Sequence, residues 1–153
     1  MYSGLRKSHK PMEQKDISAM MLAFADEAVK MAREGFEVEL DFSENSLQKV
    51  EEILSGLSTE MPESASDASI DEMSKMWGGY LGEVVRRRWG GEWTIDYYPG
   101  GQFLIITLNV NGSKLFPSMK VNRRLTEGPQ ENIWDFYKTV KARLEAKPGG
   151  RVQ

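Results

Sequence analysis

The stretch from Trp77 to Trp93 limits, more than any other part of the chain, what this sequence can fold into. Apolar residues recur in it, and just before it, at three- and four-residue intervals, which places their side chains on one face of a helix. The pair Ser69 and Glu72 has the spacing of a capping box, which predicts that this helix starts at Ser69. Gly90-Gly91 ends it, and an aromatic strand follows at Trp93. The sequence therefore predicts a central helix joined closely to a strand.

Three glycines, Gly78, Gly79 and Gly82, lie inside this predicted helix. Each costs a helix about 1 kcal/mol relative to alanine, so a helix that keeps three of them uses the missing side chains. Room for a ligand is one possible use. We expect the other use, close packing of a second element against the edge that Gly78 and Gly82 share.

The rest of the chain divides into segments by the same reasoning. The period of the apolar residues predicts an amphipathic helix over 14–33, a half-buried strand over 36–42 and a helix capped by Ser43 that ends in a polar loop over 58–69. Strands follow at 93–98, 103–110 and 114–116, and 119–121 extends or re-enters the sheet after Pro117. A last helix is predicted from Pro129 to Pro148.

Two turn signals connect the later strands. Pro99-Gly100 fits the centre of a type II turn, and Asn111-Gly112 predicts a two-residue hairpin. The segment 103–110 is apolar on both faces, which predicts a central strand covered on both sides. The predicted fold class is α+β, an antiparallel meander of three to four strands flanked by about four helices, in the order α-β-α-α-β-β-β-α. It forms a single domain over 14–147, with a flexible lead-in at 1–13 and a flexible tail at 148–153.

Composition excludes several kinds of site. The chain has no cysteine and its single histidine, His9, lies in the lead-in, so Ser-His-Asp or Cys-His catalysis, a zinc site and a disulfide framework are not expected. No metal or cofactor is predicted. The net charge of −3 and the absence of a basic tract argue against nucleic-acid binding. Neither a signal peptide nor a membrane span is predicted, and a cytoplasmic location is expected.

Candidate functional residues form two basic clusters. The first, Arg86, Arg87, Arg88 and Trp89, ends the central helix, where cations also suit the helix dipole. The second, Lys120, Arg123 and Arg124, follows the third predicted strand of the meander. If the two converge, their guanidinium groups can bind carboxylates or phosphates, and tryptophan and arginine are frequent anchors of interfaces. Solvated, helix-capping charges are the alternative.

Glu83 is the candidate carboxylate. It precedes Arg86 and Arg87 by three and four residues, a spacing that predicts surface ion pairs worth a few tenths of a kcal/mol. A role for Glu83 as a catalytic base is the alternative interpretation.

The second half of the chain resembles a bacterial family of small domains of unknown function. The resemblance rests on Tyr80-Leu81-Gly82-Glu83 with Gly90-Gly91-Glu92-Trp93, then Phe116-Pro117, Lys120, Arg123-Arg124-Leu125 and a final helix with Phe136-Tyr137, a signature of the form YLGEVxRRxxGGxW followed by FPxxKVxRRL. It implies a bacterial cytoplasmic domain and carries no activity.

Together these observations predict a non-catalytic protein-protein binding module whose partner is another protein. By analogy alone, toxin-neutralising immunity proteins are small, acidic, cysteine-free α+β proteins of this kind. The alternative is a small-anion-binding domain, or an enzyme that uses a carboxylate base such as Glu83. The sequence leaves the oligomeric state open.

Overall fold

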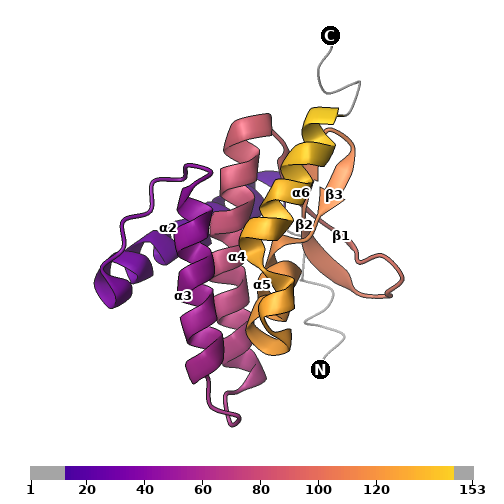
Figure 1. Ribbon diagram of the computed structural model, residues 1–153. Coiled ribbons are helices and arrows are strands. Elements are labelled where there is room, and N and C mark those ends of the chain that lie inside the picture. Colours follow the sequence, from indigo (N-terminus) through magenta and orange to yellow (C-terminus); the bar gives the residue numbers. More distant parts are fainter. Residues whose placement is uncertain (1–12, 147–153) are drawn as a thin grey trace.

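The computed structural model describes residues 13–146. Of the predicted lead-in, only Glu13 is described, so His9 lies outside the described residues. The predicted tail at 148–153 lies outside them as well. Three helices come first, then a three-stranded antiparallel meander, then two helices, so the order is α-α-α-β-β-β-α-α (Figure 1). The predicted class, α+β, is correct, but the predicted order is wrong at both ends of the chain.

The first three helices are α2 (Gln14–Phe36), α3 (Ser46–Glu60) and α4 (Asp67–Trp89). Helix α2 runs on through Gly35 and takes up Phe36, the first residue of the predicted strand. The remaining residues, 37–42, form no strand: the left-handed backbone at Glu37 (φ 57°) and at Phe42 (φ 64°) limits any extended run to the few residues between them, and no described strand pairs with these. The alternating apolar side chains of this segment pack on the helical core instead.

Helix α4 is longer than predicted. It begins after Ser66, whose Oγ accepts a hydrogen bond of 3.0 Å from the backbone N–H of Ser69. The expected capping box at Ser69 and Glu72 is therefore wrong, and Ser66 provides the N-cap three residues earlier. The loop between α3 and α4 is correspondingly shorter than the predicted 58–69, because α3 extends to Glu60.

The sheet contains β1 (Glu92–Tyr97), β2 (Leu104–Val110) and β3 (Ser113–Leu115), with β2 in the centre. Both predicted turns are confirmed. Asn111 and Gly112 have φ values of 50° and 83° and close the hairpin between Val110 and Ser113. In the turn between β1 and β2, Gly101 N–H donates to the carbonyl of Tyr98 across Pro99 and Gly100, and Gly100 has a φ of 76°.

The chain after β3 is helical and does not extend the sheet. Pro117 occupies the first turn of α5 (Pro117–Glu127), where its missing N–H costs nothing, so the predicted strand at 119–121 is wrong. Pro129 starts a short 3-10 helix, η1 (Pro129–Glu131), and α6 begins only at Ile133 and ends at Ala146.

The core forms around α4. Its buried side chains include Trp77, Tyr80, Leu81, Val84 and Val85. Helices α2 and α5 pack directly on α4, and α3 and α6 cover the remaining sides, whereas the β1–β2 hairpin extends outward from the helices (Figure 1). No helix among residues 13–146 is both long enough and apolar enough to cross a membrane.

The glycines of α4 have the packing role that the sequence predicts. A Cβ on Gly78 would lie 2.6 Å from the Cα of Ser118, and one on Gly82 would collide with the indole of Trp93. Gly79 faces the backbone of α2 in the same way, 3.0 Å from the carbonyl oxygen of Met21. The three glycines therefore allow α5, β1 and α2 to approach α4 closely.

Candidate functional site

Glu83 lies inside the junction between α4 and β1, and its side chain is 1% exposed. Arg86 donates two hydrogen bonds to it, of 2.7 Å from Nε and 3.0 Å from Nη2, and Arg87 Nε donates a third of 3.3 Å. The indole Nε1 of Trp93 donates a fourth, of 2.9 Å. Glu83 forms the predicted ion pairs with Arg86 and Arg87, but they are not surface pairs, because the carboxylate is buried. The tight Gly90-Gly91 turn brings the Trp93 indole over it.

The environment of Glu83 keeps it ionised. Burial raises the pKa of this carboxyl, but the hydrogen bonds from Arg86 and Trp93, the charge of Arg86 and the hydrogen bond from Arg87 outweigh it, so the pKa lies below its ordinary value. A general base near neutral pH needs a raised pKa and an accessible lone pair. Glu83 has a lowered pKa and four donors on its two oxygens, so its geometry is that of a structural anion.

Arg87 also contacts the segment before α3. Its guanidinium lies 3.6 Å from the centre of the Phe42 ring, and that ring stacks on Tyr80 at 4.6 Å. The Tyr80 hydroxyl accepts a 2.8 Å hydrogen bond from the Phe42 N–H and shares another of 2.7 Å with Ser46 Oγ. Arg87 therefore helps to hold the 37–45 segment against α4.

Arg88 binds carboxylates from two other elements. Its Nη1 lies 3.0 Å from Glu44, and its Nη2 lies 3.5 Å from Glu145 on α6. Lys141 and the Tyr137 hydroxyl donate to the same Glu44 carboxylate, and their hydrogen bonds lower its pKa. Burial raises the pKa of Tyr137, and its hydrogen bond to Glu44 raises it further. Trp89 packs beside the Tyr137 ring with 6.0 Å between the ring centres.

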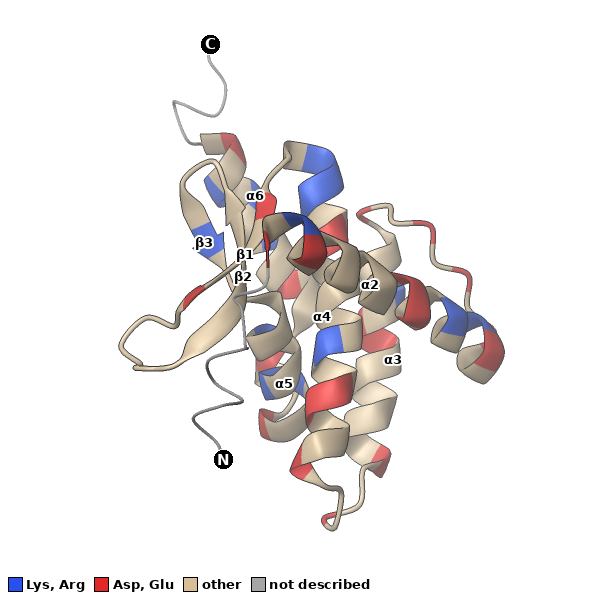
Figure 2. Cartoon of the chain, turned by 180° about the vertical axis from the view of Figure 1, so that it is seen from behind, with Lys and Arg blue, Asp and Glu red and all other residues tan. Residues whose placement is uncertain are grey.

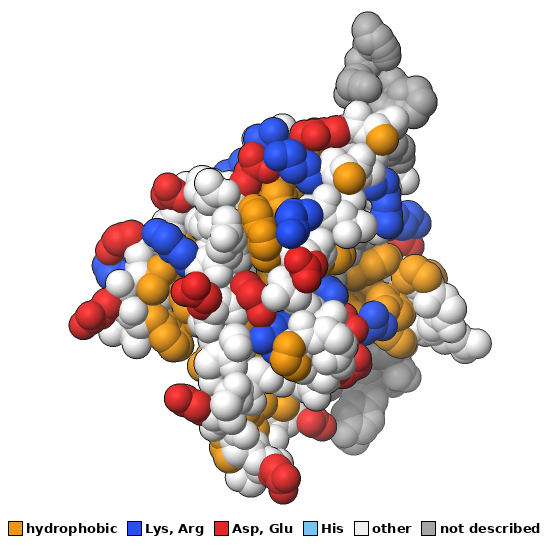
Figure 3. Space-filling view, in the orientation of Figure 1, with side chains coloured by type: hydrophobic (Ala, Val, Ile, Leu, Met, Phe, Trp, Pro, Cys, Tyr) orange, Lys and Arg blue, Asp and Glu red, His pale blue; other side chains and the backbone are white. Residues whose placement is uncertain are grey.

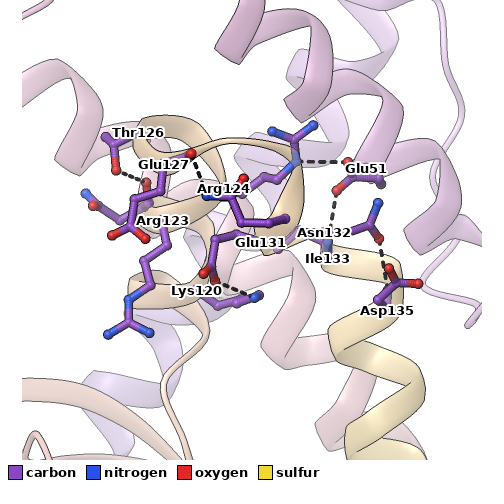
Figure 4. Close-up of polar contacts among 12 residues, drawn as sticks. Glu51, Lys120, Arg123, Arg124, Thr126, Glu127, Glu131, Asn132, Ile133 and Asp135 are labelled. Atoms are coloured by element: carbon purple, nitrogen blue, oxygen red, sulfur yellow. Dashed lines mark hydrogen bonds and ion pairs between the residues drawn. The ribbon is translucent and has the colours of Figure 1, made fainter.

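The second basic cluster lies on α5 (Figure 4). Arg124 is 2% exposed and pairs with Glu51 of α3 at 2.9 Å, and the other oxygen of Glu51 accepts a 2.9 Å hydrogen bond from the N–H of Ile133, which starts α6. Lys120 pairs with Glu131 at 2.7 Å. Arg123 donates a 2.6 Å hydrogen bond to the hydroxyl of Tyr98.

The structure does not bring the two basic clusters together. Helix α5 runs antiparallel to α4. Pro117, its first residue, contacts Gly82, and Ser118 contacts Gly78, which is one turn nearer the N-terminus of α4. Arg123 and Arg124 therefore lie toward the N-terminal half of α4, away from Arg86–Arg88 at its C-terminal end. Acidic and basic residues are interspersed over the helices (Figure 2), and each of the six basic candidates is bound by a carboxylate or, for Arg123, a hydroxyl, with Arg86 and Arg87 sharing Glu83. A joint anion site does not form.

The hairpin carries an apolar surface that the sequence analysis missed. On its inner face Trp93 pairs with Leu108, Ile95 with Ile106, and Tyr97 with Leu104. The first pair is fully buried under α4, and Ile106 of the second pair is half-buried against the core, but Ile95, Tyr97 and Leu104 are 40%, 60% and 59% exposed. We call Ile95, Tyr97, Leu104 and Ile106 the hairpin overhang. Apolar side chains gather in the region of the hairpin in the space-filling view (Figure 3).

A groove of about 400 Å³ separates the hairpin overhang from the helices. One wall is apolar and comes from β2, and the other is largely polar and comes from α4 and α5. The lining residues are Leu104, Ile105, Ile106, Asp71, Ser74, Lys75, Ser118, Met119 and Asn122.

The expectation that β2 is covered on both faces is wrong for its first residues, whose burial decreases toward Leu104. Apolar residues continue along the whole strand and are densest in its exposed first half, so the apolar pattern cannot show where the covering layer ends. One signal was present. Pro117 limits β3 to three residues, which pair with Leu108–Val110, so the other half of β2 has β1 as its only neighbouring strand.

Comparisons with protein-family models, with curated proteins and with solved structures found no match for this chain. Its site therefore has to be judged from geometry. Among residues 13–146 no group of three or more His, Asp or Glu side chains is placed to hold a metal ion. Two features stand out: the Glu83 junction, whose carboxylate has all its donors within the fold, and the hairpin overhang, which no other element of the described chain covers.

Proposed function

We propose that this chain is a non-catalytic protein-binding module and that the hairpin overhang is its contact surface. The observation that carries the proposal is the concentration of exposed apolar side chains. Of the seven large apolar side chains that are exposed in the described residues, three, Ile95, Tyr97 and Leu104, belong to the hairpin overhang. A contiguous exposed apolar patch on a small protein commonly marks an interaction surface, and tyrosine is a frequent anchor there.

Polar groups border this surface as they border a typical interface. Lys75 and Asp71 form an ion pair of 2.9 Å on the opposite wall of the groove, and Asn122 lies beside them. A polar rim around an apolar centre favours a protein partner over a lipid surface. A bacterial cytoplasmic setting is part of this proposal, and immunity proteins remain an example by analogy only.

The basic residues that the sequence suggested as binding anchors are less suited to this role. Arg86 and Arg87 neutralise Glu83, and Arg124 neutralises Glu51, so a partner would have to compete with carboxylates already in place. An anion site or an enzyme with Glu83 as base requires free donors or an accessible base. The arrangement of the ion pairs therefore supports the apolar surface as the binding site.

Site-specific photo-crosslinking in the native host tests the proposal. A photoreactive amino acid at position 104, in the hairpin overhang, should capture a discrete protein in stoichiometric amounts. The same amino acid at position 31 is the matched control, because Met31 is also exposed, 43% against 59%, but lies on α2. Equal labelling from both positions, or no protein adduct from position 104, would contradict the proposal.

Once the captured protein is purified, its affinity can be compared between variants. We expect Tyr97→Ser and Leu104→Ser each to weaken binding about ten-fold or more, since loss of a central apolar anchor costs about 1–2 kcal/mol or more. The melting temperature should barely change, because both side chains are more than half exposed. Met31→Ser should leave the affinity unchanged.

A further inference from the structure

The backbone groups of β1 alternate between the neighbouring strand and the free edge. Tyr98 N–H donates to Phe103 O at 3.2 Å, toward β2, whereas Tyr97 N–H is bound by its neighbouring side chain, Asp96 Oδ1, at 2.8 Å. At the other end of the strand, the carbonyl oxygen of Trp93 accepts a hydrogen bond from the Gln14 side chain of α2. Because the two backbone groups of a residue in an antiparallel strand point to the same side, those of Trp93, Ile95 and Tyr97 face the free edge.

β1 is an outer strand of the sheet, and α2 packs beside its Trp93 end. Within residues 13–146 no hydrogen bond satisfies the outward N–H and C=O of Ile95. On either side, side chains supply the hydrogen bonds that an added strand would otherwise supply. Gln14 provides a donor to the Trp93 carbonyl, and Asp96 provides an acceptor for the Tyr97 N–H. An unpaired edge of this kind is a template for a further strand.

We propose that the added strand is β1 of a second copy of this chain, paired antiparallel about a two-fold axis at Ile95. This inference goes beyond the proposed function: the second copy binds the edge of β1, and the hairpin overhang, which lies on a face of the sheet, stays open to the partner of the proposed function. In this register Ile95 lies opposite Ile95 of the second copy and exchanges two hydrogen bonds with it. Trp93 lies opposite Tyr97 of the second copy, so the Tyr97 N–H, now held by Asp96, meets the Trp93 C=O, now held by Gln14; pairing therefore requires the Gln14 side chain to move off the edge.

The edge is complementary to itself, as a two-fold interface must be. Asp96 lies opposite Thr94 of the second copy, so the only charge in the central three pairs faces a hydroxyl and not another carboxylate. Ile95, which is 40% exposed in the single chain, lies against its own copy. The pairing joins two three-stranded sheets into one of six strands, and the two hairpin overhangs then share one face.

Sedimentation velocity of the full chain, from micromolar to sub-millimolar concentration, tests the pairing. We expect the wild type to reach twice the monomer mass and Ile95→Lys and Ile95→Glu each to remain monomeric, because each places like charges opposite one another. An equimolar mixture of these two variants should dimerise again, since opposite charges then meet at the axis. Met31→Lys, at an exposed apolar position of α2, should dimerise like the wild type.

A cysteine crosslink measures the register itself. The chain has no cysteine, so Ile95→Cys introduces a single thiol. Directly opposed residues of a hydrogen-bonded antiparallel pair have Cα atoms about 5.5 Å apart, within the range of a disulfide. Mild oxidation should therefore convert Ile95→Cys almost completely to a covalent dimer, whereas Met31→Cys should crosslink only in traces.

A wild type that stays monomeric at the highest concentration would overturn the inference, as would a dimer that persists in both charged variants. Circular dichroism of each variant shows whether it is folded. The photo-crosslinking experiment separates the two proposals. If the chain is monomeric and position 104 captures a different protein, the second-copy inference is wrong and the proposed binding function stands. If the chain is monomeric and position 104 gives no adduct, both proposals are wrong.

Discussion

The indole Nε1 of Trp93 donates a 2.9 Å hydrogen bond to Oε2 of Glu83, and this bond ties the first residues of β1 to the last turns of α4. The same indole lies against Gly82, one residue before Glu83 on α4. One side chain thus fixes the sheet to the helix both by packing and by hydrogen bonding. Because this joint sets where the hairpin leaves the helices, it also determines how far the hairpin overhang extends beyond them.

Gly82→Ala tests the packing half of this joint. The added methyl group would collide with the Trp93 indole, so we expect it to destabilise the fold by about 2–3 kcal/mol, the cost typical of overpacking. Gly56→Ala is the matched control, because a Cβ at this position of α3 meets nothing within 4 Å. It should stabilise the protein by up to about 1 kcal/mol through helix propensity. Urea unfolding of both variants measures the difference, and equal effects would contradict the packing role.

Glu83→Gln tests the hydrogen-bonding half. It leaves Arg86 and Arg87 without their carboxylate partner in a partly buried site, which we expect to cost about 2–3 kcal/mol of unfolding free energy. This is less than for a fully buried pair, because the two arginines are 38% and 40% exposed. Asp71→Asn breaks the exposed pair with Lys75 and should cost less than about 0.5 kcal/mol. A Glu83→Gln variant as stable as Asp71→Asn would show that the network contributes little.

The stability of the wild type should fall in acid because of the same residue. The pKa of Glu83 is lower in the folded chain than its ordinary 4.5, so its contribution is present above pH 4.5 and is lost as the pH falls through the folded value. Glu83→Gln cannot titrate at this position. The difference in unfolding free energy between wild type and Glu83→Gln should therefore shrink below pH 4.5, as urea titrations at several pH values can show. A constant difference would mean that Glu83 is not ionised in the fold.

Glu51 should be important for stability, because it binds both Arg124 and the first N–H of α6. Glu51→Gln leaves the almost fully buried Arg124 without a counter-charge, and we expect a loss of about 3 kcal/mol. Glu51→Ala also removes the acceptor for the Ile133 N–H and should cost about 1 kcal/mol more. Lys120→Gln, in the more exposed pair with Glu131, should cost less than about 1 kcal/mol. Thermal and urea unfolding should give this order, and any other order would contradict it.

The sequence predicted well those elements whose signals are local. Asn111-Gly112 and Pro99-Gly100 specify their turns by backbone preference alone, and the apolar period of α4 specifies a helix. The segment 36–42 failed because alternation shows only that every second side chain is buried. A segment that lies across helices satisfies the same pattern as a strand in a sheet.

The candidate site was harder to predict, because its properties depend on contacts distant in sequence. Glu83 has the spacing of a surface ion pair, and only the position of Trp93 above it makes the carboxylate buried. Arg124 is neutralised by Glu51, 73 residues away, which no local pattern reveals. The hairpin overhang depends on how far the helices extend along the sheet, and this is a property of the assembled fold.

The short distance in sequence between Glu83 and Trp93 has a consequence for how the chain folds. Only 10 residues separate them, and the Gly90-Gly91 turn lies between, so closing this loop costs little entropy. The contact between Glu51 and Arg124 closes a far longer loop. We expect α4 and β1 to associate in the folding transition state, so that Trp93→Phe slows folding while Glu51→Gln mainly speeds unfolding. Stopped-flow kinetics of the two variants would show whether the joint that positions the hairpin is also where folding begins.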